Sequence, residues 1–229
     1  MGGKLVFAWP SDLLLLYALS LAAILFSGIL LLMFTIIFKH GSRLKSEKIQ
    51  TKFVASIQSA IELSQKNANI QTEIAKINSL IASHKKDVAY GWVRLLEKTP
   101  KSDRTKYVAI AGQTNMIHCI PHCLNEEGLA EKCIALEAIG LSGFDQYIND
   151  VQKYVYQGGI APYACIALSR LIGIATLPQI IQSYEKGTLS TTQALSAIVE
   201  IPKDLIVTYL QDPKNIPLPK QLYRYLGIT

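Results

Sequence analysis

The longest uniform pattern in the chain is an uncharged, apolar run of 26 residues at positions 13–38. A helix needs about 20 such residues to cross the ~30 Å hydrocarbon core of a bilayer, so this run is long enough to span it with some tilt. A cleavable signal peptide would have an apolar stretch of roughly 7–15 residues and an A-x-A-like cleavage site, which is missing here. Trp9, just before the run, suits the interfacial aromatic belt. We therefore predict a permanent transmembrane helix at 13–38.

The next segment, residues 39–99, begins with a basic flank and continues with the spacing of amphipathic helices. Its apolar positions recur every three or four residues, at Phe53, Ile57 and Ile61 and then at Ile70, Ile74, Ile77 and Ile81. A break is predicted at 65–69. The pattern fits either a coiled-coil stalk that dimerises or two antiparallel helices that pack on the next domain. Only about two heptads are regular, whereas three or four indicate a coiled coil, so the antiparallel hairpin is favoured.

Residues 100–229 contain an internal repeat. The tetrapeptide Cys-Ile-Ala-Leu occurs at 133–136 and 165–168, and a third copy opens with Ala-Leu at 194–195. Each copy starts a stripe of small and aliphatic residues, which is followed by a break with Gly or Pro and by a second amphipathic helix. Periods of 32 and 27 residues with two helices each are typical of an α-solenoid. A partial fourth copy at 217–228 closes an array of about 3–4 repeats.

This repeat resembles the HEAT family, especially its short bacterial form. Residues 131–140, EKCIALEAIG, are similar to the first-helix consensus of that family, whose small-small-Leu-Gly core is matched by Ala135, Ala138, Ile139 and Gly140. The second copy departs from the pattern, because Arg170 stands at the position of Ala138, and the third copy lacks the glycine. The resemblance implies a HEAT-like α-solenoid at 100–229. Together with the apolar run and the amphipathic segment, it predicts an all-α chain: a single transmembrane helix, then a helical hairpin or stalk, then the solenoid.

The charges on the two sides of the apolar run predict its orientation. Before the run stand Lys4 and the amino terminus, opposed by Asp12, and after it come Lys39, Arg43, Lys45, Lys48 and Lys52, opposed by Glu47. Because Lys and Arg are retained on the cytoplasmic side, we predict a single-pass inner (plasma) membrane protein with residues 1–12 outside and residues 39–229 in the cytoplasm. The five basic residues after the run are expected to contact anionic lipid headgroups.

Nucleic acid is not an expected partner. Residues 1–52 hold six Lys and Arg against two Asp and Glu, which leaves only +2 of the net charge of +6 for the rest of the chain. A nucleic-acid-binding domain would carry a basic face of its own.

The sharpest candidate for chemistry is the segment HCIPHC at 118–123. It contains His118, Cys119, His122 and Cys123, which are zinc-type ligands. Four ligands from one short helix cannot surround a tetrahedral ion, and the neighbouring apolar residues favour buried, inert cysteines. The alternative is a metal- or tetrapyrrole-handling protein, since some bacterial HEAT-like proteins are bilin lyases. A serine elbow, a Gly-rich phosphate loop and an HExxH motif are missing, so we expect neither enzymatic activity nor a cofactor.

Tyrosines recur near the ends of the second helices, and these are the candidate partner-binding residues: Tyr154, Tyr156, Tyr184, Tyr209, Tyr223 and Tyr225. The resemblance implies that second helices line a concave, protein-binding face, and tyrosine is enriched at interfaces. The opposing interpretation, that each tyrosine seals the seam between repeats, is favoured. We expect a non-catalytic scaffold or adaptor, a subunit of a larger inner-membrane assembly of the secretion or exopolysaccharide type, bound to other proteins of that complex. A coiled-coil structural dimer is the remaining alternative.

Overall fold

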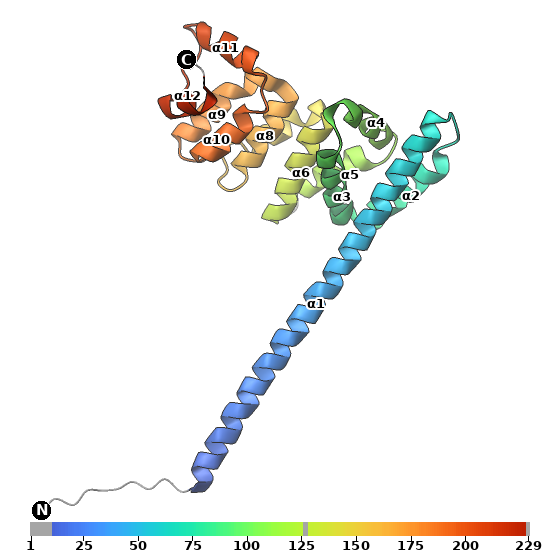
Figure 1. Cartoon of the computed structure of the whole chain (residues 1–229), viewed down its shortest axis with the longest axis vertical. Helices are drawn as coiled ribbons and strands as arrows, with labels where there is room; N and C mark the ends of the chain where they lie inside the picture. The colour runs from blue at the N-terminus through green and yellow to red at the C-terminus, as the bar shows by residue number, and fades with distance from the viewer. Residues whose placement is uncertain (1–10, 126–127, 228–229) are drawn as a thin grey trace, which may run out of the picture. The chain divides into compact units, whose positions relative to one another are not determined.

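Helices account for all regular structure in the computed structural model, which describes residues 11–125 and 128–227. Strands are absent from these residues, so the prediction of an all-α chain with a long apolar N-terminal helix is confirmed. The chain divides into two compact units, Met1–Lys48 and Ile49–Thr229. Helix α1, Ser11–Gln65, passes through the boundary between them (Figure 1).

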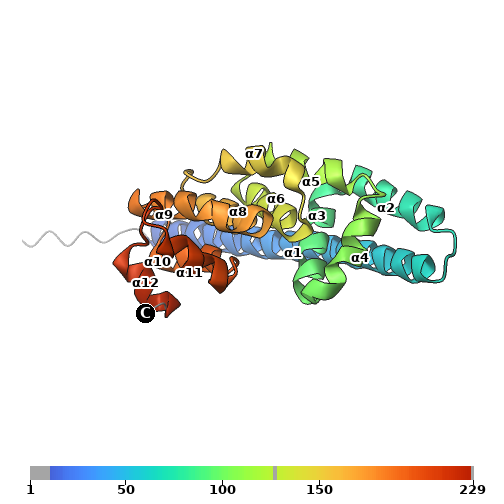
Figure 2. The same ribbon diagram turned by 90° about the horizontal axis from the view of Figure 1, so that it is seen from above.

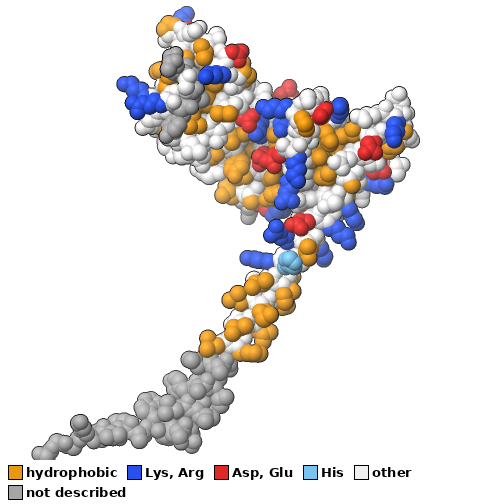
Figure 3. Space-filling view, in the orientation of Figure 1, with side chains coloured by type: hydrophobic (Ala, Val, Ile, Leu, Met, Phe, Trp, Pro, Cys, Tyr) orange, Lys and Arg blue, Asp and Glu red, His pale blue; other side chains and the backbone are white. Residues whose placement is uncertain are grey.

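The described part of the first unit is the apolar portion of α1. Every side chain from Ile24 to Phe38 is exposed there, and apolar side chains follow the helix in Figure 3. By length and composition α1 is a candidate membrane span, and none of its apolar window is buried. A second segment of sufficient length and apolarity, Ala161–Glu185, is half buried and contributes to the core of the second unit. The side chains of 13–19 and 21–23, where the predicted span begins, lie outside the described part.

The second unit consists of the end of α1 and a series of shorter helices (Figures 1 and 2). In chain order these are α2 (Gln71–Ser83), α3 (Lys85–Lys98), α4 (Lys101–Ala111), α5 (Met116–Leu124), α6 (Leu129–Ser142), the 3-10 turn η1 (Asp145–Tyr147), α7 (Ile148–Gln152), α8 (Ala161–Ile172), the 3-10 turn η2 (Gly173–Thr176), α9 (Leu177–Glu185), α10 (Thr191–Ile198), α11 (Lys203–Gln211) and α12 (Lys220–Leu226).

Alternate helices of this unit contact one another in chain order. Helix α3 packs on α6, α6 on α8, α8 on α10, and α10 on α12. Intervening helices pack against this row: α5 contacts α3 and α6, α7 contacts α8, and α9 contacts α8 and α10. Figures 1 and 2 show α6, α8 and α10 following one another in this order. Consecutive helix pairs therefore bury each other's apolar faces.

The apolar stripe predicted at 53–81 is buried in the core of the second unit. Its buried members are Phe53, Ile57, Ile61, Ile74, Ile77 and Ile81. The ring of Phe53 meets Trp92 of α3 edge-on, with centroids 6.4 Å apart, and the indole N–H of Trp92 donates a 2.8 Å hydrogen bond to Ser142 Oγ of α6. Residues of the same chain thus cover most of this stripe.

The burial pattern gives the repeat a different register from the one read in the sequence. The fully buried small-x-x-small-aliphatic positions are Ala135, Ala138 and Ile139 in α6, Ala164, Ala167 and Leu168 in α8, and Ala194, Ala197 and Ile198 in α10. These triplets start 29 and 30 residues apart, not 32 and 27. The alignment of the two Cys-Ile-Ala-Leu segments is therefore shifted by about one helical turn from the alignment of the buried positions. Cys133 is half-buried whereas Cys165 is fully buried, so the two cysteines are not equivalent.

Helices α6 and α8 approach each other closely at Gly140. A Cβ added to Gly140 would lie 2.7 Å from the Cα of Ala167 and 3.1 Å from its Cβ, closer than side-chain atoms tolerate. Small residues at 138, 164 and 167 flank this contact. Gly140 is therefore required by the distance between the two helix backbones.

Gly140→Ala is expected to destabilise the second unit by about 1–3 kcal/mol, because the added methyl group forces α6 and α8 apart. The loss outweighs the roughly 1 kcal/mol that alanine gains over glycine inside a helix. Unfolding by urea can be followed in detergent micelles through the fluorescence of Trp92, in a Trp9→Phe background. Gly112→Ala is the matched control, because its nearest contact would be 3.5 Å and its φ is −62°. Equal stability of the two variants would contradict the steric account.

Candidate functional site: partner-binding surfaces

The tyrosines at 154, 184 and 209 are half-buried and packed against the core. The Tyr154 hydroxyl donates a 3.0 Å hydrogen bond to the carbonyl of Leu124 at the end of α5. The Tyr184 hydroxyl donates to Gln221 of α12, and the Tyr209 hydroxyl accepts from the Ile216 amide at 3.3 Å. Each hydroxyl thus joins segments far apart in the chain or closes a turn. This is the geometry of tyrosines that seal seams.

The remaining candidate tyrosines differ in exposure. Tyr156 is 43% exposed, donates a hydrogen bond to Gln182, and has the Lys186 ammonium 4.3 Å from its ring centroid. Tyr223 is half-buried, and the side chain of Tyr225 lies outside the described part. Tyr156 therefore presents the most accessible aromatic surface among the five described candidates.

The segment HCIPHC lies in α5, where its residues point in different directions. Cys119 and Cys123 are buried, and the Cys123 thiol lies 3.8 Å from the Cys119 carbonyl oxygen. His118 is exposed, and the side chain of His122 is outside the described part. Among the described residues, no group of three or more His, Cys, Asp or Glu side chains is placed to hold a metal ion.

The basic residues after the apolar run lie on α1 and are all exposed: Lys39, Arg43, Lys45, Lys48 and Lys52. Arg43 pairs with Glu47 at 3.0 Å, one helical turn away. Exposure leaves these side chains free to reach an anionic surface.

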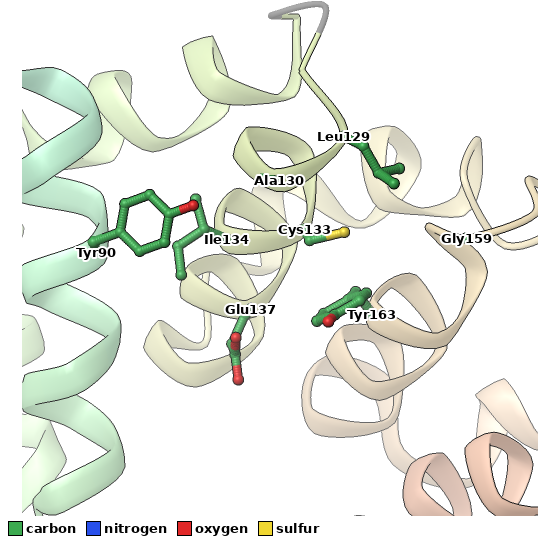
Figure 4. A pocket seen from close by; sticks show the side chains of 8 residues that line it. All are labelled: Tyr90, Leu129, Ala130, Cys133, Ile134, Glu137, Gly159 and Tyr163. Carbon is green, nitrogen blue, oxygen red and sulfur yellow. The ribbon is translucent and has the colours of Figure 1, made fainter. Parts of the chain in front are cut away.

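A groove of about 460 Å³ lies over α6, at a place that the sequence does not reveal. Figure 4 shows Tyr90 of α3 on one side and Tyr163 of α8 on the other, with Cys133 of α6 between them. Its lining residues are Tyr90, Leu129, Ala130, Cys133, Ile134, Glu137, Gly159 and Tyr163. The signal that could have found it is the run of outward-facing apolar residues on α6, which is visible only once the register is known.

The cysteine thiols near this groove are poor nucleophiles. Burial, and then the charge of Glu137, raise the pKa of Cys133. Burial raises the pKa of Cys165 to about 12, although a hydrogen bond with Ser183 opposes the shift. Both thiols are therefore protonated at neutral pH, and the thiolate needed for nucleophilic chemistry is scarce.

One carboxyl group, that of Glu137, lines the groove. Burial raises the pKa of Glu137, and the charge of Glu97, with which it shares a side-chain hydrogen bond, adds to this shift against the opposing charge of Arg170. Arg170 itself donates a 2.7 Å hydrogen bond to Glu200 from Nη2. Arg170 therefore divides its charge between Glu137 and Glu200.

The Glu200 carboxylate lies next to basic residues from two segments that are distant in the sequence. Lys101 of α4 lies 3.9 Å from its carboxylate, in addition to Arg170 of α8. Burial alone would raise the pKa of Glu200, but the hydrogen bond and charge of Arg170, with Lys101 and Arg104, lower it overall. This ion-pair cluster ties α4 and α8 to the turn after α10.

No protein-family model, curated protein sequence or solved structure matches the chain. The family resemblance therefore stays a proposal, supported by the repeat motifs and by the order in which the helices pack.

Tyr154→Phe is expected to lower the free energy of unfolding by about 1 kcal/mol, because the Leu124 carbonyl loses its hydrogen-bond donor at a half-buried position. Tyr163→Phe is the matched control, since Tyr163 is 39% exposed and its hydroxyl forms no hydrogen bond with another described residue. Urea unfolding of the full chain in micelles measures both. A loss as large in Tyr163→Phe as in Tyr154→Phe would contradict the seam role.

Glu200→Gln is expected to cost about 1 kcal/mol at pH 7, because Arg170 loses a charged partner at a half-buried site. A carboxyl whose folded pKa is lowered adds stability above its ordinary pKa, and this stability is lost as the pH falls through the folded value. The difference between variant and wild type should therefore shrink below about pH 4. Lys106→Gln, which breaks the exposed pair with Asp103, is the control and should change stability by only a few tenths of a kcal/mol. A pH-independent difference would contradict this assignment.

Proposed function

We propose that this protein is a membrane-anchored, non-catalytic scaffold or adaptor that binds a partner protein, as a subunit of a larger inner-membrane assembly such as a secretion or exopolysaccharide machine. The observation that carries the proposal is helix α1. Its apolar portion is exposed and long enough to cross a bilayer, and its last turns contribute Phe53 and Ile57 to the core of a folded helical unit. Such a helix fixes a folded surface at a membrane.

The folded unit is proposed to be a HEAT-like solenoid. Support comes from the contacts of α3, α6, α8, α10 and α12 in chain order and from the repeated buried alanines of α6, α8 and α10. Paired helices stack closely only where side chains are short, and stacked repeats create extended surfaces suited to protein binding. Fold alone does not determine function, so the binding role rests on the anchor as well.

The orientation is proposed from charge. Five exposed basic residues follow the apolar run, and each Lys or Arg near an anionic leaflet contributes about 1 kcal/mol of attraction. This charge asymmetry supports an orientation with the N-terminus outside and the folded unit in the cytoplasm.

Of the candidate tyrosines, those at 154, 184 and 209 are proposed to hold the repeats together, because their hydroxyls are engaged within the chain. Contact with the partner protein is then proposed to involve residues that are more exposed. Tyr156 and the groove over α6 are two described surfaces with exposed aromatic or aliphatic side chains.

The full chain is expected to stay in the membrane fraction after carbonate extraction, because an apolar helix of this length partitions into the bilayer. A tag at the C-terminus should be protected from protease in spheroplasts and cut in inverted inner-membrane vesicles. Replacing Lys39, Arg43, Lys45 and Lys48 together by Gln should reduce this asymmetry. Release by carbonate, or a tag cut in spheroplasts, would contradict the anchoring or the orientation respectively.

Partner binding is tested by crosslinking in native membranes and purifying the tagged full chain in mild detergent. A defined membrane-complex protein should co-purify in constant proportion with the full chain. Residues 1–65, which keep the anchor and the basic flank without the helices that follow, are the matched control and should not retain it. Identical proteins in both samples, or none in the full-chain sample, would overturn the scaffold proposal.

A further inference from the structure

The groove over α6 has aromatic walls and an apolar floor. Tyr90 and Tyr163 stand on opposite sides of it, and the outward stripe of α6 forms the floor (Figure 4). Leu129 is 55% exposed and Tyr163 39%, so the groove is open to solvent. About 460 Å³ holds one or two large side chains of a bound segment.

Part of the floor is exposed apolar surface. Leu129 and Ala130 of α6 are exposed, whereas Ile134 is half-buried and packs against the core. In the register given by burial, Cys133 and Ile134 of α6 correspond to Thr192 and Gln193 of α10, which are exposed and polar. Exposed apolar side chains that gather at one place mark interaction sites.

The charge at the end of the groove selects a cationic group. Glu137 is the acidic residue among the lining, and Glu97 lies against it. The charge of Arg170 acts on Glu137, but Arg170 also bonds to Glu200, and Lys86 pairs with Glu131 at the start of α6. A basic side chain entering beside Glu137 would meet two carboxyl groups, and the tyrosine rings offer cation–π contact along its path.

We infer that the groove over α6 binds a helical segment of a partner membrane protein that presents a leucine-like side chain next to a Lys or Arg, as found just after a membrane span on the cytoplasmic side. Aliphatic residues flanked by Lys and Arg are what positive-inside topology places there. The inference rests on the proposed function, because it names the segment that the scaffold holds.

Cys133 supplies a built-in reporter for occupancy. It is half-buried in the groove, whereas Cys119, Cys123 and Cys165 are buried. The full chain in nanodiscs is treated with maleimide at pH 8.5, with and without a synthetic amphipathic peptide of Leu and Lys. The same peptide with every Lys replaced by Glu is the matched probe. The Leu–Lys peptide is expected to slow labelling of Cys133 at least about fivefold and to bind about tenfold more tightly than the Leu–Glu peptide, by fluorescence anisotropy.

Two variants test the geometry. Ala130→Trp fills the groove from an exposed position and should abolish binding, whereas Ser196→Trp, exposed on α10, should leave it unchanged. Glu137→Gln should reduce the preference for the Leu–Lys peptide to about twofold or less while Trp92 fluorescence shows the fold intact. Equal binding of both peptides, or binding that survives Ala130→Trp, would overturn the inference.

Two further results separate this inference from the proposed function. If Ala130→Trp still captures the native-membrane partner as wild type does, the groove assignment fails and the scaffold proposal stands. If a peptide of residues 39–52 of this chain protects Cys133 and the designed Leu–Lys peptide does not, the occupant is a second copy, and the partner assignment is overturned.

Discussion

The second unit depends on how closely α6 can approach α8. At Gly140 the backbones are so near that a methyl group would collide with Ala167, and the fully buried alanines of α6, α8 and α10 extend the same condition along the row. Close backbones let the aliphatic side chains on either side interdigitate over their whole length. This contact sets the spacing of the helices. The hydrogen bonds of the tyrosines, the Arg170–Glu200 pair and the groove all depend on that spacing.

Helix α1 changes character along its length. From Ile24 to Phe38 it carries uncharged, exposed residues on all sides, which makes it a candidate membrane span. Its last part, from Phe53 onward, buries one face in the core and leaves the other to water. The basic residues lie between the two regimes, where charged ends can remain hydrated while the helix continues. A single uninterrupted helix can therefore serve both as anchor and as the first wall of a domain.

Sequence reasoning found the features that depend on local pattern. The apolar run, the all-helical composition and the Phe53–Ile81 stripe follow from hydrophobic period alone, and the structure has them as expected. The repeat register predicted from the two Cys-Ile-Ala-Leu segments differs from the register given by burial. Identical residues at 133–136 and 165–168 do not show which positions are buried, and only the packed helices reveal this. The groove is not predictable from the sequence, because Tyr90, Cys133 and Tyr163 come from three different helices. Their spacing along the chain does not indicate that these helices are neighbours.

The seam bonds have a consequence for how this fold can change. Tyr154 and Ser183 both donate to main-chain carbonyls of the preceding segment, those of Leu124 and Val155. A carbonyl is present whatever side chain its residue carries. These two bonds therefore do not depend on which side chains stand at 124 and 155, so both positions can change without removing the acceptor.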